Sequence, residues 1–175
     1  MATRIVDANP YYHLGMYLDA LEFLDEERDA WRQFEALAEL TDEQLERPVD
    51  GAHGWSGRDL MIHMLGWLDV SLRAAKELAV RDDSPALIER DREQHERGID
   101  ALNAEITARA VDLSTAEIRD RYRLVPGELR GYFTVVPETR WVKHPTHLRA
   151  FLEDTTEHYE GHAADLAAIL AAART

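Results

Sequence analysis

The sequence contains no cysteine. This absence excludes disulfide bonds, a cysteine nucleophile and any metal site built from thiolates. A metal ion bound by this chain would therefore be held by histidine, aspartate or glutamate side chains. A thiol that takes part in the chemistry of this protein would have to come from a small molecule.

Long apolar runs are also missing. No stretch approaches the ~18 consecutive apolar residues that a transmembrane helix needs. The N-terminus lacks the basic start and apolar segment of a signal peptide. Because 45% of the residues are hydrophobic and 31% are charged, the composition is that of a folded globular domain. We therefore expect a single cytoplasmic domain over residues 1–175 with no membrane partner.

Basic residues are scarce relative to acidic ones: the chain has 20 Lys and Arg against 34 Asp and Glu, which gives a formal net charge of −14. A field of this sign repels phosphate backbones, and no basic patch is interleaved with aromatic residues. We expect no nucleic-acid partner, a small molecule as the substrate, and most of the charge on solvated helix faces.

The spacing of apolar residues predicts an all-α fold, a four-helix bundle. The first helix is expected over about residues 11–40. Ser56, with Asp59 three residues later, forms a capping box that predicts the start of the second helix, which runs to about Val80. Ser84 and Pro85 predict the start of the third helix as its N-cap and first residue. One apolar stripe of this third helix contains Ile88, Ile99, Leu102 and Ile106.

The segment from Leu124 to His144 is the least regular part of the sequence. A capping box at Ser114 predicts only a short helix before it, ending near Tyr122. The segment contains Pro126, Gly127, Gly131 and Pro137, and its run 132–136 could be extended. We expect a long irregular crossover packed against the bundle, which could form part of a pocket wall, and a last helix that begins near Pro145.

Three histidines lie on the apolar faces of the expected helices. His158 and His162 are four residues apart on the last helix, which puts both imidazoles on one face. His63 lies on the buried side of the second helix, so only the fold could bring it to the pair. Three imidazoles with an open fourth position are typical of a catalytic metal site. A hydrogen-bonded network of core histidines without metal is the alternative.

His95 is a separate candidate. It lies between Ile88 and Ile99 on the expected third helix, where it could line a pocket near the metal or hydrogen-bond a substrate. The alternative is a histidine that is satisfied in the core or at its edge.

Two motifs resemble those of the DinB-like superfamily, which includes mycothiol-dependent maleylpyruvate isomerases. The segment from Trp55 to Trp67, with the pattern W-S-x-x-D-x-x-x-H, resembles the second helix of that superfamily and ends its pattern at His63. The motif H-x-x-x-H at His158 and His162 resembles the pair of ligands on its last helix. The resemblance implies a DinB-like bundle in which these three histidines bind one divalent metal ion.

The resemblance also implies a function. The metal, zinc or nickel for an all-histidine set, would activate a low-molecular-weight thiol that reacts with an electrophilic substrate, as in a thiol-dependent transferase or isomerase. A homodimer is expected by analogy. A metal-dependent hydrolase and a metal-stabilised binding or protective protein without catalysis are the alternatives, together with a structural protein that holds no metal.

Overall fold

The computed structural model describes residues 17–174, and this part of the chain is helical without any strand, as the sequence predicts. It contains eight α-helices and three short 3-10 helices. The α-helices are α1 (Ala20–Trp31), α2 (Asp42–Glu46), α3 (Gly57–Val80), α4 (Pro85–Arg97), α5 (Ile99–Arg109), α6 (Thr115–Phe133), α7 (Pro145–Asp154) and α8 (Thr156–Ala172). The 3-10 helices are η1 (Phe34–Glu39), η2 (Asp50–Ala52) and η3 (Glu138–Arg140).

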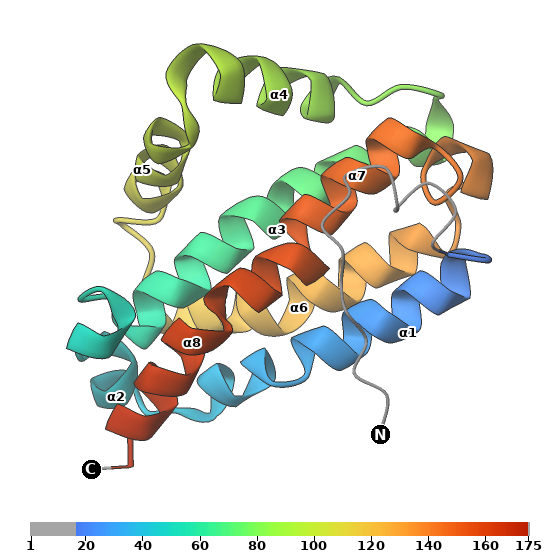
Figure 1. The fold of residues 1–175 in the computed structure, drawn as a ribbon. Coiled ribbons are helices and arrows are strands. Elements are labelled where there is room, and N and C mark those ends of the chain that lie inside the picture. The colour runs from blue at the N-terminus through green and yellow to red at the C-terminus, as the bar shows by residue number, and fades with distance from the viewer. Residues whose placement is uncertain (1–16, 175) are drawn as a thin grey trace, which may run out of the picture.

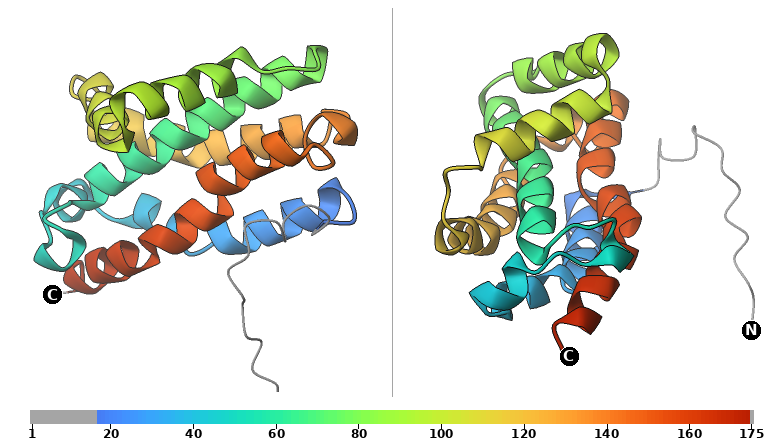
Figure 2. Two further views of the ribbon diagram at one scale, coloured as in Figure 1. Left: turned by 45° about the horizontal axis from the view of Figure 1, so that its top comes forward. Right: turned by 90° about the vertical axis from the view of Figure 1, so that its left-hand side faces the viewer.

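Four long helical segments lie side by side around one core: α1, α3, α6 and the consecutive pair α7 and α8 (Figure 1). The helices α4 and α5 lie outside this group and cover α3, as the second view of Figure 2 shows. None of the described helices is long and apolar enough to cross a membrane.

Aromatic side chains fill the core and set the rotation of α8. Tyr159 is fully buried and its ring packs against Trp31 and Phe34, with centroid distances of 5.1 and 5.7 Å. Its hydroxyl donates a hydrogen bond to the buried carboxylate of Glu27 on α1. Because Tyr159 faces α1, the neighbouring His158 is turned towards α3.

The expected helix starts at Ser56, Ser84 and Ser114 are confirmed. Each serine side chain accepts a hydrogen bond from a backbone N–H in the first turn of α3, α4 or α6. At Ser56 and Ser114 the acidic residue three positions later completes a capping box. These caps fix where each helix begins and therefore which side chains face the core.

The first expected helix is too long at its C-terminal end. α1 ends at Trp31, and the chain continues through η1. Residues 11–16 of the expectation lie outside the described residues. Asp19 caps the start of α1, so Leu18 lies outside the helix and Leu21 faces solvent, with 81% and 66% of their surfaces exposed. Residues 17–19 of the expected helix are therefore not helical.

Two further helices predicted as continuous are broken. The third expected helix divides into α4 and α5 at Gly98, whose φ of +81° is a backbone conformation that favours glycine. The last one divides into α7 and α8 at Thr155, whose hydroxyl donates to the carbonyl of Phe151. Ile88 and Ile99 are consequently exposed, and they do not share a buried stripe with Leu102.

The prediction of an irregular segment from Leu124 onwards is wrong in its first half. α6 continues through Pro126 to Phe133, so the run 132–136 is not extended. Pro126 lacks the N–H for one helical hydrogen bond. The core face of α6 offsets this loss, because Val125, Leu129 and Phe133 are buried there. Only residues 134–144 form the irregular connection to α7.

Candidate metal centre

Two helices bring the three predicted histidines together. His63 lies two turns into α3, and His158 and His162 lie one turn apart on α8. The three rings face one another, with centroid distances between 4.6 and 4.9 Å. The Nε2 atoms of His63 and His158 are 2.9 Å apart. His63 is buried and the other two rings are half-buried.

Neighbouring groups determine which ring nitrogens face the cluster. The Nδ1–H of His162 donates to Asp165 Oδ2 at 2.9 Å, because a carboxylate can only accept. This bond leaves Nε2 of His162 as the free lone pair. The buried Nδ1 of His158 makes no hydrogen bond of regular geometry. The backbone of Asp154 acts on this ring only by opposing part of the fall in its pKa.

The protonation of two of these rings is shifted strongly towards the neutral form. Burial, together with the neighbouring His162, lowers the pKa of His63 to about 4. Burial and the positive charge that His63 and His162 would carry lower the pKa of His158 to about 3. Both imidazoles are therefore neutral at pH 7, which is the form that binds metals.

The arrangement fits one divalent cation. Nitrogens bound to a tetrahedral metal at ~2.1 Å lie about 3.4 Å from one another. The pair of His63 and His158 is near this separation, and the ligand atoms of all three histidines lie within 4.8 Å of one another. Small ring rotations would place all three nitrogens on one ion. Without a cation, only one proton can lie between the two close Nε2 atoms. Three neutral imidazoles have three ring-nitrogen lone pairs, so two of these would then accept no hydrogen bond within the cluster.

Aromatic side chains and a cavity surround the cluster. The ring of Trp55 stacks on His162, with 5.7 Å between centroids, and Trp67 meets His158 edge-on at 6.0 Å. A cavity of about 360 Å³ opens in front of the histidines. Its polar lining comes from Arg90, Gln94, Asn103, Glu153 and Asp154. A small molecule can therefore approach the open side of the cluster.

The structure does not bring the other expected groups to this cavity. His95 is exposed on α4, and the neighbouring Gln94 is the residue that lines the cavity. Nothing from residues 124–144 lines it either. The expectation that this segment forms part of the wall is wrong for this cavity.

No family model, curated protein or solved structure matches the chain. The resemblance to the DinB-like superfamily therefore rests on the two sequence motifs alone. The geometry of the three histidines stands independently of that resemblance.

Sequence reasoning missed two groups that shape the centre. Asp165 lies one turn after His162, and its spacing of three residues on a helix was the available signal. Arg90 lies on a covering helix and carries no motif. It forms ion pairs with Glu153 and Asp154 beside the cavity. Its position beside the cavity follows only from the tertiary structure.

Proposed function

We propose that this protein is a metal-dependent enzyme of the DinB-like superfamily that joins a low-molecular-weight thiol to an electrophilic small molecule. The observation that carries the proposal is the convergence of three imidazoles on one point beside a cavity. No carboxylate belongs to the cluster of candidate ligands in the described residues. An all-imidazole set suits zinc or nickel.

The chain supplies ligands and a pocket, and the thiol comes from solution. A divalent cation held by His63, His158 and His162 would deprotonate a thiol that binds to it. In a displacement, the new carbon–sulfur bond forms as the bond to the leaving group breaks, the leaving group departs with that electron pair, and the thiol proton passes to solvent. In an addition to a double bond, the sulfur bonds to one carbon and the displaced π electrons take up a proton at the other atom. A cysteine-free chain avoids competition from its own thiols for the ion.

The residues around the cluster have supporting roles. Asp165 orients His162 so that Nε2 faces the ion. Trp55 covers one side of the cluster and limits the access of water. The polar lining around Arg90 and Asn103 gives a substrate hydrogen-bond partners. We further propose that the protein acts as a cytoplasmic homodimer.

A metal-dependent hydrolase is the second candidate. The carboxylates of Glu153 and Asp154 line the same cavity, and a hydrolase requires a base near the attacking water. In the structure these carboxylates are paired with Arg90, which favours the thiol reaction over this alternative.

The test starts with untagged protein loaded with zinc or nickel and dialysed. We expect about one metal ion per chain by elemental analysis. The loaded protein is then mixed with mycothiol and monochlorobimane, whose thiol adduct is fluorescent, with glutathione and cysteine in parallel. Metal-dependent adduct formation that His158→Ala abolishes is expected. Failure to retain metal after loading would refute the proposal, and hydrolysis of ester substrates without added thiol would favour the second candidate.

A further inference from the structure

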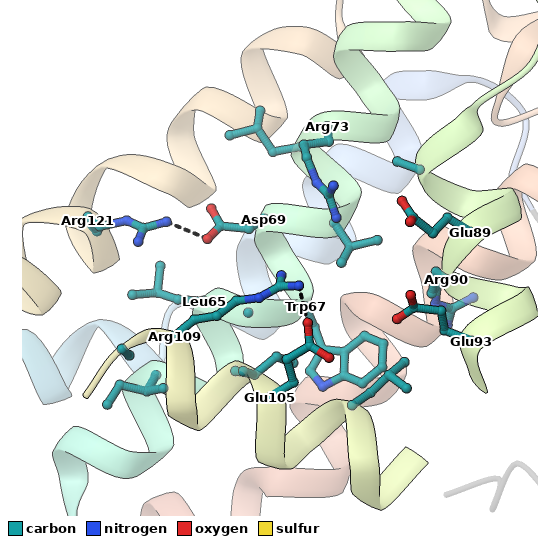
Figure 3. A pocket seen from close by; sticks show the side chains of 18 of the residues that line it. Leu65, Trp67, Asp69, Arg73, Glu89, Arg90, Glu93, Glu105, Arg109 and Arg121 are labelled. Atoms are coloured by element: carbon teal, nitrogen blue, oxygen red, sulfur yellow. Dashed lines mark hydrogen bonds and ion pairs between the residues drawn. The ribbon is translucent and has the colours of Figure 1, made fainter. Parts of the chain in front are cut away.

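A second cavity, of about 520 Å³, lies between α3 and the covering helices α4 and α5 (Figure 3). None of the three histidines lines it. Trp67 and Arg90 line both cavities and form the wall between them. The indole N–H of Trp67 donates to Asn103, and the guanidinium of Arg90 lies 5.7 Å from its ring centroid. Contacts with Asn103 and with Arg90 therefore hold Trp67 in place within this wall.

The floor of the second cavity is apolar. Leu65, Leu72 and Ile118 are buried there, and Ile106 of α5 closes one side. Gly66 permits this closure, because a Cβ at its position would lie 2.3 Å from Ile106 Cγ2. A volume of this size between packed helices is typical of a site for a small apolar-bodied ligand.

The charges around this cavity are paired with one exception. Its lining contains five basic and four acidic side chains. The acids pair with arginines, in the pairs Asp69 with Arg121, Glu89 with Arg92, Glu93 with Arg97 and Glu105 with Arg109. Two of the remaining bases are also paired, Lys76 with Glu128 and Arg90 with Glu153 and Asp154.

Arg73 is the exception. It is the charged side chain of the lining for which the described residues provide neither an ion pair nor a hydrogen bond. This lack of a partner stands against the net charge of −14 that the protein carries. Figure 3 shows its guanidinium extending from α3 into the cavity. A guanidinium recognises a carboxylate through two parallel hydrogen bonds. An unpaired Arg73 beside an apolar floor therefore selects a ligand with a carboxylate at one end and an apolar body.

We propose that this second cavity binds a small amphipathic carboxylate of the medium-chain fatty acid class. The carboxylate pairs with Arg73, and the hydrocarbon chain covers Leu65 and Ile106. An amine would meet the unpaired guanidinium and be repelled. An alcohol of the same length would fill the floor but leave the guanidinium without a partner.

Calorimetric titration of the full chain tests this proposal with octanoate, 1-octanol and octylamine. We expect octanoate to bind at least tenfold more tightly than octanol, and octylamine not to bind. Affinity should rise about fourfold for each methylene from hexanoate to octanoate, since each buried methylene contributes ~0.8 kcal/mol. Arg73→Gln should weaken octanoate binding at least tenfold. The matched control is Arg81→Gln, at an exposed arginine just after the same helix and outside the lining, and it should have no effect.

Metal binding separates this proposal from the proposed enzyme. His158→Ala should lose metal and keep octanoate binding, whereas Arg73→Gln should lose octanoate and keep metal. Circular dichroism melting confirms that each variant is folded. No octanoate binding at millimolar concentration by the folded wild-type protein would overturn the inference. Equal affinity for octanoate and octanol, or for the wild type and Arg73→Gln, would also overturn it.

Discussion

The Nε2 atoms of His63 and His158 lie 2.9 Å apart, although 95 residues separate these histidines in the chain. Their proximity depends on two local devices. The capping box at Ser56 fixes where α3 begins, and the buried Tyr159 sets the rotation of α8. Two imidazole nitrogens at this distance share one proton or one cation, so the pair is the centre of any chemistry at this site.

Replacing His158 by alanine should abolish metal binding while the fold persists. The half-buried ring contributes one of three ligands, and its loss leaves two, which we expect to weaken zinc binding at least a hundredfold. Competition with a chromogenic chelator measures the affinity. His95→Ala is the matched control: that histidine is exposed on α4, and its removal should leave the affinity unchanged. Equal zinc affinity in both variants would contradict the assignment of the site.

Replacing Asp165 should weaken metal binding, because Asp165 orients the ligand His162. Its carboxylate accepts the Nδ1–H of that histidine and so holds Nε2 ready for a metal. Loss of such a partner typically costs 10–100-fold in metal affinity. We expect about that loss in Asp165→Ala and partial recovery in Asp165→Asn, whose amide oxygen still accepts a hydrogen bond. His53 also approaches Asp165, at 3.7 Å, but its side chain is exposed, so His53→Ala should not change the affinity. An unchanged affinity in Asp165→Ala would exclude this orienting role.

The metal-free protein should lose stability as the pH falls below about 6.5. The unfolded histidines take up protons near this pH. In the folded protein, burial lowers the pKa of His63 to about 4 and that of His158 to about 3. Between pH ~6.5 and these lower pKa values, the unfolded state therefore binds more protons than the folded state. As the pH decreases through this range, the free energy of unfolding decreases by several kcal/mol. Above pH ~6.5 the contribution of these two histidines to the stability is fully present.

Guanidinium chloride titrations of the metal-free protein at about pH 7 and pH 5 measure this effect. The double variant His63→Phe/His158→Phe removes both groups and leaves the titration of the carboxylates in place. The difference between its pH dependence and that of the wild type isolates the histidines. The same slope in both proteins would show that these rings do not carry the predicted shifts.

The sequence was sufficient where local chemistry decides the outcome. The serine caps predicted where α3, α4 and α6 begin, because a side chain that bonds the first turn acts within three residues. Helical spacing then predicted that His158 and His162 share a face. The position of His63 on the buried side of the second helix made it the third candidate, the resemblance to a known superfamily supported it, and the structure places all three together.

Tertiary packing decided what the sequence could not. α6 passes through Pro126, because burying the apolar face around Leu129 outweighs the lost hydrogen bond. The break at Thr155 uses a hydroxyl bond that is equally possible inside a helix, so no local signal marks it. The position of Arg90 beside the metal centre depends on how α4 folds back over α3, which apolar spacing does not specify.

Gly66 should be the glycine at which alanine is most costly. An added Cβ would lie 2.3 Å from Ile106 Cγ2, so α5 would have to move away from α3. Overpacking of this kind typically costs about 1–3 kcal/mol of unfolding free energy. Gly127→Ala is the matched control, because that glycine lies exposed within α6 and a Cβ there meets nothing within 4 Å. It should stabilise the protein by about 0.5–1 kcal/mol.

The double variant Gly66→Ala/Ile106→Ala tests the cause of this cost. Truncating Ile106 removes the atoms that an added Cβ would meet, so the two substitutions should cost less together than the sum of their separate costs. Denaturant unfolding of the four proteins in the cycle measures this coupling. Strict additivity would show that the loss in Gly66→Ala has another origin. Coupling would establish that the close approach of α5 to α3 depends on this glycine.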